Sequence, residues 1–338
     1  MKSFKYFFIF FAIFIAFAPV FSYADEAECN FEKIFYLSQE NEADAIDSIN
    51  KNWQKIDIIA PQAYAVTSKL ILNGGLSSKL KKAIKDHSLK VMPLVVNANF
   101  NRKIINDLLR SKTKQDAIIE GLVYLAKKNN YIGWQYDFEN IDYKDKDLFT
   151  SFVERTSKVF KENDLILSVA VVARSVDYED TEAFKSWSGV YDYKKIADDV
   201  DFVSLMAYDD PQSKGPVASL DFVNKSLEYV KDKILAEKLS MGVPLYYWKW
   251  DTDTNKRIGS GLYKSVLAIA SNVIHLLEFD KSLGVSCLSY SYNNKNYKVW
   301  FESKSSFEKK LDIIKENNLR GFSAWLIGGE DPGIWKVL

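Results

Sequence analysis

The chain has 338 residues with 45 basic and 45 acidic side chains, so it carries no formal net charge near neutral pH. This balance leaves no basic excess to neutralise phosphates, and we expect no nucleic-acid partner. Hydrophobic residues make up 47% of the chain and aromatic residues 14%, which is enough for one large core.

The first 24 residues predict a cleaved secretory signal peptide. Two lysines precede an apolar run that ends at Phe21, and Ser22 and Ala24 form a small-x-small cleavage site. An uncleaved membrane anchor is the alternative interpretation. We therefore expect residues 25–338 to be secreted or held in the periplasm or cell envelope, without a stable membrane span after cleavage.

Cysteine and histidine are scarce. Cys29 and Cys287 are the only cysteines, and the sequence does not decide whether they pair. His87 and His275 are too few for a histidine-based triad or a histidine-rich metal site. We expect no metal and no cofactor.

Eight apolar runs follow the signal, and amphipathic helical patterns separate them. The runs cover residues 33–38, 56–66, 89–97, 131–139, 165–173, 200–208, 239–247 and 320–328. Helical periodicity marks residues 115–130, 145–163 and 305–318. This alternation predicts an α/β fold, a (β/α)8 TIM barrel. An open doubly wound sheet is the alternative, but no glycine-rich phosphate loop follows the first run.

The alternation is interrupted once, after the seventh run. Residues 249–304 are too many for an ordinary loop, and they hold a helical pattern over residues 261–279 and a strand-like stretch after it. We predict a small α+β insertion on the barrel rim. Trp248 and Trp250 lie where it begins, and they either stack on sugars or pack the insertion against the barrel.

The fourth run, YIGWQYDFE, ends in two acids. Its aromatic residues alternate with Gln135, Asp137 and Glu139, so these three share the opposite face. Barrel active sites lie at the carboxyl ends of the strands, which places Asp137 and Glu139 in the mouth. Two carboxyl groups held close together disfavour double ionisation, so one can stay protonated and act as a general acid. A strand with one solvated face explains the same pattern without any function.

Other strand ends bring further side chains to the same mouth. They are Gln62 and Tyr64 after the second run, Tyr208 and Asp209 after the sixth, and Trp325 after the eighth. An acid pair, a phenol and a tryptophan suit a sugar, because they offer a proton, hydrogen bonds and an aromatic floor. Asn97 and Asn99, after the third run, either line the cleft or make turns, and turns are favoured.

At these residues the chain resembles the family 18 glycoside hydrolases, the chitinase family. The family pattern D-G-x-D-x-D-x-E matches residues 132–139, where Asp137 and Glu139 are present but Ile132 and Gln135 replace the two earlier acids. The resemblance extends from about residue 31 to the end. The C-terminal third is similar to bacterial members related to spore-germination and cell-wall hydrolases.

The family's sixth-strand pattern M-x-Y-D matches residues 206–209, and its eighth-strand tryptophan matches Trp325. The resemblance implies that Tyr208 hydrogen-bonds the acetamido oxygen of the substrate and that Trp325 forms the floor of the subsite. Met206 and Asp209 are expected to shape the pocket.

The resemblance also implies substrate-assisted catalysis. Glu139 would protonate the glycosidic oxygen, and the substrate's own N-acetyl carbonyl would attack the anomeric carbon. Asp137 would orient the acetamido N–H. We expect Gln135 to contribute to substrate binding, to hydrogen-bond Asp137 and to shift the pH profile.

The sequence therefore predicts an exported, monomeric glycoside hydrolase that cleaves β-1,4 linkages of N-acetylglucosamine-containing glycans. Export and the resemblance favour peptidoglycan or its fragments, without excluding chitin oligosaccharides. A non-catalytic glycan-binding protein is the alternative, and the presence of Glu139 argues against it. An interaction protein with a vestigial cleft is a third hypothesis.

Overall fold

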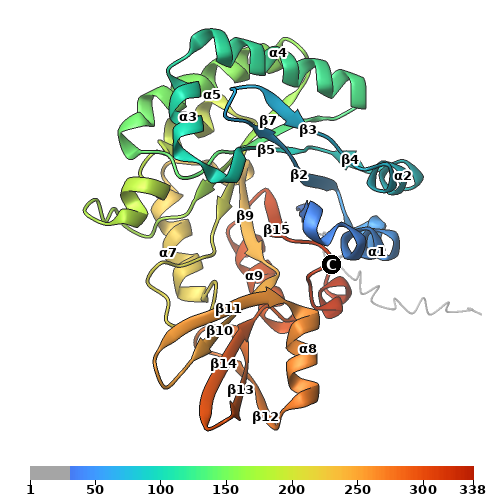
Figure 1. Cartoon of the computed structure of the whole chain (residues 1–338), viewed down its shortest axis with the longest axis vertical. Helices are drawn as coiled ribbons and strands as arrows, with labels where there is room; N and C mark the ends of the chain where they lie inside the picture. The colour runs from blue at the N-terminus through green and yellow to red at the C-terminus, as the bar shows by residue number, and fades with distance from the viewer. Residues whose placement is uncertain (1–30) are drawn as a thin grey trace, which may run out of the picture. The chain divides into compact units, whose positions relative to one another are not determined.

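Eight parallel strands close into a barrel in the computed structural model, which describes residues 31–338 (Figure 1). The predicted signal peptide and Cys29 lie outside the described residues. Each barrel strand pairs with the next in chain order, and the last pairs with the first. The strands are β1 Glu32–Ser38, β2 Ile58–Val66, β5 Leu94–Asn97, β6 Gly133–Asp137, β7 Ile166–Val172, β8 Phe202–Met206, β9 Leu239–Pro244 and β15 Gly321–Trp325. The predicted (β/α)8 barrel is confirmed.

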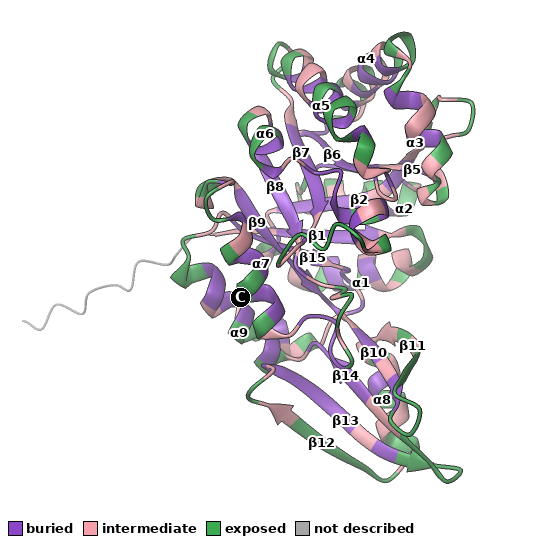
Figure 2. Cartoon of the chain, turned by 90° about the vertical axis from the view of Figure 1, so that its left-hand side faces the viewer, coloured by how far each residue is buried: buried purple, intermediate pink, exposed green. Residues whose placement is uncertain are grey.

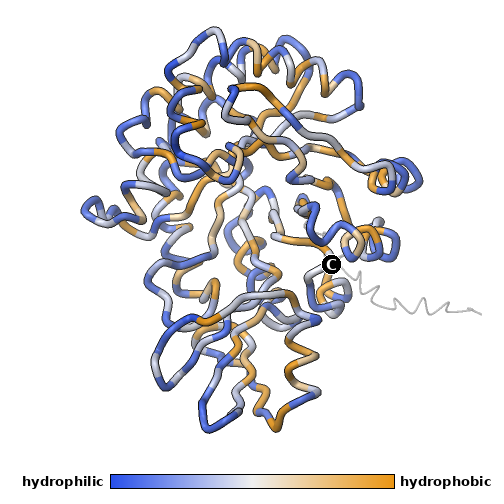
Figure 3. The backbone as a smooth tube through the Cα atoms, viewed as in Figure 1, coloured by the Kyte–Doolittle hydropathy of each residue, from blue (hydrophilic) through white to orange (hydrophobic). Residues whose placement is uncertain are grey.

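Helices surround the barrel, and hydrophilic and hydrophobic positions alternate along their backbones (Figure 3). They are α1 Glu42–Asn52, α2 Ser78–Asp86, α3 Arg102–Leu109, α4 Lys112–Asn129, α5 Lys146–Lys161, α6 Tyr193–Asp199, α7 Leu220–Val230 and α9 Lys304–Glu316. The three predicted helical segments correspond to α4, α5 and α9. Two short strands, β3 Leu72–Gly74 and β4 Lys90–Val91, extend the sheet beside β2.

Strand β6 is buried along its whole length, and most residues of the other barrel strands are buried as well (Figure 2). Trp134, Tyr136 and Phe138 are fully buried. Tyr136 stacks on Phe152 of α5 with ring centroids 5.3 Å apart, and the Trp134 indole donates to the Leu122 carbonyl at 3.0 Å. Each ring buries an area worth roughly 1.5–3 kcal/mol. This anchoring fixes which face of β6 points to the barrel axis.

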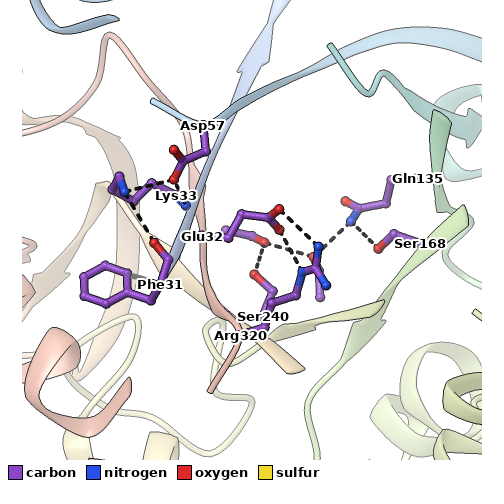
Figure 4. A network of polar contacts seen from close by, with 10 residues as sticks. Phe31, Glu32, Lys33, Asp57, Gln135, Ser168, Ser240 and Arg320 are labelled. Carbon is purple, nitrogen blue, oxygen red and sulfur yellow. Dashed lines mark hydrogen bonds and ion pairs between the residues drawn. The ribbon is translucent and has the colours of Figure 1, made fainter. Parts of the chain in front are cut away.

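An ion pair closes the amino-terminal end of the barrel (Figure 4). The guanidinium of Arg320 donates to both carboxylate oxygens of Glu32, at 2.8 and 3.1 Å, and lies 4.6 Å above the ring of Phe202. These contacts join the starts of β1, β15 and β8. A cleft lies at the opposite, carboxyl ends of the strands.

An insertion follows β9 and forms a five-stranded antiparallel sheet with one helix. Its elements are β10 Tyr246–Asp251, β11 Lys256–Leu262, α8 Tyr263–Asn272, β12 His275–Asp280, β13 Val285–Tyr292 and β14 Lys295–Phe301, in the sheet order β11-β10-β14-β13-β12. Trp248 and Trp250 pack in a cluster with Cys287 and Trp300. Among the described residues, no helix is both long enough and apolar enough to cross a membrane.

The helix predicted over residues 261–279 is wrong in its second half. Helix α8 ends at Asn272, and His275–Asp280 forms the edge strand β12, which pairs with β13. A short apolar run cannot be assigned to helix or strand by periodicity alone. In this structure, hydrogen bonding to β13 makes residues 275–280 a strand, and the backbone is already extended at Val273.

Candidate active site

Asp137 ends strand β6 inside the cleft. The side chain is only 5% exposed, and its Oδ2 accepts a long hydrogen bond of 3.5 Å from the Gln62 amide. Its Oδ1 is buried without a hydrogen-bond partner among the described residues. Burial raises the pKa of Asp137 from the usual 3.8 to about 6. A buried carboxyl oxygen without a partner is costly unless a ligand supplies a donor.

Glu139 follows two residues later and lines the same cleft. Burial raises its pKa well above the usual 4.5, and the neighbouring charges of Asp137 and Asp209 act in the same direction. Glu139 therefore keeps its proton at neutral pH more readily than an ordinary glutamate does. A protonated carboxyl group in a cleft is equipped for general acid catalysis.

Asn97 holds the backbone of Glu139 on both sides. The amide oxygen of Asn97 accepts from the Glu139 N–H at 3.1 Å, and its amide nitrogen donates to the Glu139 carbonyl at 3.0 Å. Asn97 is fully buried at the end of β5. The Tyr191 hydroxyl donates to the Phe138 carbonyl at 2.9 Å. Asn97 thus fixes the acid, whereas Asn99 makes a turn with φ of 56°.

A cleft of about 910 Å³ surrounds the acid pair. Seven of the predicted site residues line it: Asp137, Glu139, Tyr208, Trp325, Met206, Asp209 and Gln62. The sequence analysis missed others, including Tyr36, Trp187, Tyr246 and Arg257. Tyr36 and Tyr246 belong to predicted strand ends and could have been found there. Arg257 reaches the cleft only through the pairing of β11 with β10, which has no local signal.

The phenol and indole groups lie at neighbouring strand ends. Burial raises the pKa of Tyr208 well above 10, so its hydroxyl stays protonated and can donate a hydrogen bond. The Tyr246 hydroxyl donates to Asp209 at 2.7 Å and its ring packs edge-on against Tyr208. Trp325 also lines the cleft, and its ring centroid lies 5.8 Å from that of Tyr36.

Tyr64 does not reach the cleft, and the prediction that it does is wrong. A β-bulge between Gln62 and Tyr64 shifts the register of β2 against β5 and reverses the alternation of side chains. Tyr64 therefore points into the layer beneath the helices. Its hydroxyl lies 3.0 Å from the Tyr131 hydroxyl, and its ring packs edge-on against Trp134.

Gln135 lies below the cleft, so the predictions that it binds substrate and hydrogen-bonds Asp137 are wrong. It is fully buried, and its oxygen accepts from the Tyr36 hydroxyl at 2.7 Å. Its amide nitrogen donates to Ser168 at 2.8 Å (Figure 4) and to Ser204 at 2.9 Å. The amide is occupied by the barrel interior and has no donor left for Asp137.

The functional groups of the cleft are carboxyl, phenol and indole side chains. Within residues 31–338, no three His, Cys, Asp or Glu side chains are grouped so as to hold a metal ion. The cleft combines a carboxyl group with a raised pKa, a second carboxyl, a phenol and an indole at the carboxyl ends of parallel strands. Fold and site together define a glycosidase of the barrel type.

Comparison with known proteins gives the family. Glycosyl hydrolases family 18 matches residues 11–330. The chain is 26% identical over 301 residues to the uncharacterized glycosylase YvbX of Bacillus subtilis (strain 168), covering 86% of each chain. It is 26% identical over 273 residues to the cortical fragment-lytic enzyme of the same organism, covering 77% of this chain and 62% of that protein. The crystal structure of the spore cortex-lytic enzyme SleL of Bacillus megaterium QM B1551 matches with a TM-score of 0.79 and 23% identity, covering 91% of this chain and 73% of that one. The chain belongs to glycosyl hydrolase family 18 and is a hydrolase.

Proposed function

We propose that the chain is an exported hydrolase of β-1,4 linkages in N-acetylglucosamine-containing glycans and that it acts by substrate-assisted catalysis. The acid pair carries this proposal. Burial and the charge of Asp137 raise the pKa of Glu139, which favours its protonated form, and the Oδ1 of Asp137 is buried without a hydrogen-bond partner among the described residues. That oxygen can accept the N–H of a substrate acetamido group.

In the first step the Glu139 carboxyl gives its proton to the glycosidic oxygen. The bond from the anomeric carbon to that oxygen breaks, and the acetamido carbonyl oxygen bonds to the anomeric carbon, giving an oxazolinium ion. Asp137 holds the acetamido N–H, and the Tyr208 hydroxyl donates to the acetamido oxygen. In the second step Glu139 takes a proton from water as the water oxygen bonds to the anomeric carbon. The bond from that carbon to the acetamido oxygen breaks, so the oxazolinium ring opens and the anomeric configuration is retained.

A carboxylate nucleophile is the competing scheme. Asp137 and Glu139 are two residues apart at the end of one strand and do not flank a glycosidic bond from opposite sides. Asp209 is the next acid in the cleft, and its carboxylate already accepts the Tyr246 hydroxyl at 2.7 Å. The acetamido group of the substrate therefore suits the role of nucleophile better.

The glycan is proposed to be peptidoglycan or its fragments. The similarity to a cortical fragment-lytic enzyme favours a bacterial cell-wall glycan over chitin. The predicted signal peptide supports action outside the cytoplasm.

The test compares N-acetylated with de-N-acetylated substrate. Chitin oligomers, chitosan oligomers and purified peptidoglycan are digested, products are identified by mass spectrometry, and the fresh anomer is followed by NMR. We expect cleavage of N-acetylated glycans with retention and resistance of chitosan. Efficient cleavage next to a free amino sugar on the non-reducing side, or an inverted first product, would refute the mechanism.

A further inference from the structure

Arg257 is the one cation among the described residues that line the cleft. It belongs to β11 of the insertion and stands opposite Trp250 in the pairing with β10. Its guanidinium lies 4.3 Å above the ring of Trp248. Both tryptophans line the cleft as well. The insertion thus contributes a cation on an aromatic support to a cleft whose reacting groups come from the barrel.

The remaining charged lining residues are acids: Asp137, Glu139, Asp209 and Asp210. They follow barrel strands β6 and β8, whereas Arg257 is on the insertion wall. Among the lining residues that the structure describes, Arg257 is therefore the single basic position beside four acids, and its charge also lowers the pKa of Asp209 against the effect of burial. A neutral glycan can accept hydrogen bonds from the guanidinium, but a sugar unit with a carboxylate gains a stronger, charge-assisted pair of hydrogen bonds.

The way Arg257 is held suits carboxylate binding. Stacking on Trp248 uses the face of the guanidinium and leaves its N–H edges for in-plane hydrogen bonds. A planar guanidinium binds a carboxylate through two parallel hydrogen bonds. Because Trp248 is only 5% exposed and fixed in the insertion core, the arginine loses less freedom when a ligand binds.

We propose that Arg257 and Trp248 form a subsite for a sugar unit bearing a carboxylate, which makes an acidic N-acetylated glycan the preferred substrate. The inference rests on the proposed function and narrows its substrate class. The carboxylate can be the lactyl ether group of N-acetylmuramic acid or a carboxylate of an attached peptide. Both have the chemistry that the arginine recognises.

The variants are Arg257→Gln, Arg257→Lys and, as a matched control, Lys298→Gln. Lys298 is on β14 of the same sheet, and its ammonium lies 4.1 Å from the ring centre of Trp300, but it is not among the lining residues of the cleft. The control thus removes the same charge from a similar aromatic support. Thermal melting checks that all three variants fold.

The ligands are chitin oligomers, peptide-free peptidoglycan strands, the same strands with their carboxyl groups reduced to alcohols, and strands with peptides attached. Hydrolysis is measured as kcat/KM. Binding is measured by calorimetry with each variant in a Glu139→Gln background. The calorimetric titrations measure how Arg257 contributes to affinity even when no substrate is cleaved. If the unsubstituted chain cleaves no N-acetylated glycan but the affinity in these titrations depends on Arg257, the proposed function fails while the subsite stands.

For peptide-free strands, we expect Arg257→Gln to lower affinity and kcat/KM about 10-fold and Arg257→Lys to lower them less, because the lysine keeps the charge but loses the fork. Reduced strands and chitin oligomers should lose much less affinity with these variants, and Lys298→Gln should resemble the unsubstituted chain throughout. A 10-fold effect only on peptide-bearing strands would assign the carboxylate to the peptide. An equal effect on reduced and unreduced strands, or none on any ligand, would overturn the proposal.

Discussion

Replacing Asp137 by Asn should stabilise the folded chain at neutral pH while impairing its chemistry. The change removes a buried charge and keeps the shape of the side chain. The pKa of Asp137 rises from 3.8 to about 6 in the folded state because of burial. At about 1.4 kcal/mol for each tenfold change in the ionisation constant, ionised Asp137 costs the folded state roughly 3 kcal/mol.

The pH window follows from the direction of this change. Below about pH 4 the carboxyl is protonated in both the folded and the unfolded chain, so the cost is absent. Between 3.8 and about 6 the unfolded chain releases the proton first, and stability is lost as the pH rises. Above pH 6 the full cost is present. Asp137→Asn also removes a charge that raises the pKa of Glu139, which adds stability in the same direction.

Urea unfolding at pH 7.5 and pH 3.5 measures the effect. We expect Asp137→Asn to gain about 3 kcal/mol in free energy of unfolding at pH 7.5 and almost nothing at pH 3.5. Asp145→Asn is the matched control, because Asp145 is also buried but accepts from Arg110 at 2.6 and 3.0 Å. It should lose roughly 1.5–3 kcal/mol at pH 7.5. An Asp137→Asn variant less stable than the unsubstituted chain at pH 7.5 would refute the burial argument.

Three further changes test the roles of single side chains. Glu139→Gln should lower turnover of an oligomeric substrate by roughly 10²–10⁴-fold and keep binding, because the amide cannot donate the needed proton; a wild-type rate would exclude Glu139 as the acid. Asn97→Ala should lower kcat more than it raises KM, with Asn97→Asp recovering part of the rate through the retained acceptor; losses that only follow the melting temperature would indicate a purely structural role. Trp325→Ala should weaken sugar binding in titrations more than it lowers the melting temperature; unchanged affinity with a loss of about 3–5 kcal/mol in stability would make it a packing residue.

The barrel was predictable because each strand is buried on both faces and gives a continuous apolar run, with helical periodicity between the runs. The acid pair was predictable because a period of two carries Asp137 and Glu139 to one face. The same periodicity gave a wrong prediction for Tyr64, because a one-residue bulge reverses which face of the sheet the following side chains point to. A bulge depends on the neighbouring strand, so the sequence of β2 alone does not reveal it.

Three other features that the sequence did not predict also depend on contacts between segments far apart in the chain. Arg257 enters the cleft because β11 pairs with β10, and His275–Asp280 becomes a strand because β13 is available beside it. Asn97 holds Glu139 across two strand ends that are 42 residues apart. Such contacts involve ordinary polar residues whose partners are set by the fold, and local patterns carry no information on them.

Because residue 135 is a glutamine, Asp137 has no acid beneath it, and its titratable neighbour in the cleft is Glu139. Where the family pattern has an acid, Gln135 is neutral, and its amide is occupied by Tyr36 and two serines. Burial raises the pKa of Tyr36 to about 12, so it remains a donor toward Gln135. The layer below Asp137 therefore has no group that takes up or releases a proton near neutral pH. The remaining titratable neighbour is Glu139, and the charge of Asp137 raises the pKa of Glu139 in addition to burial.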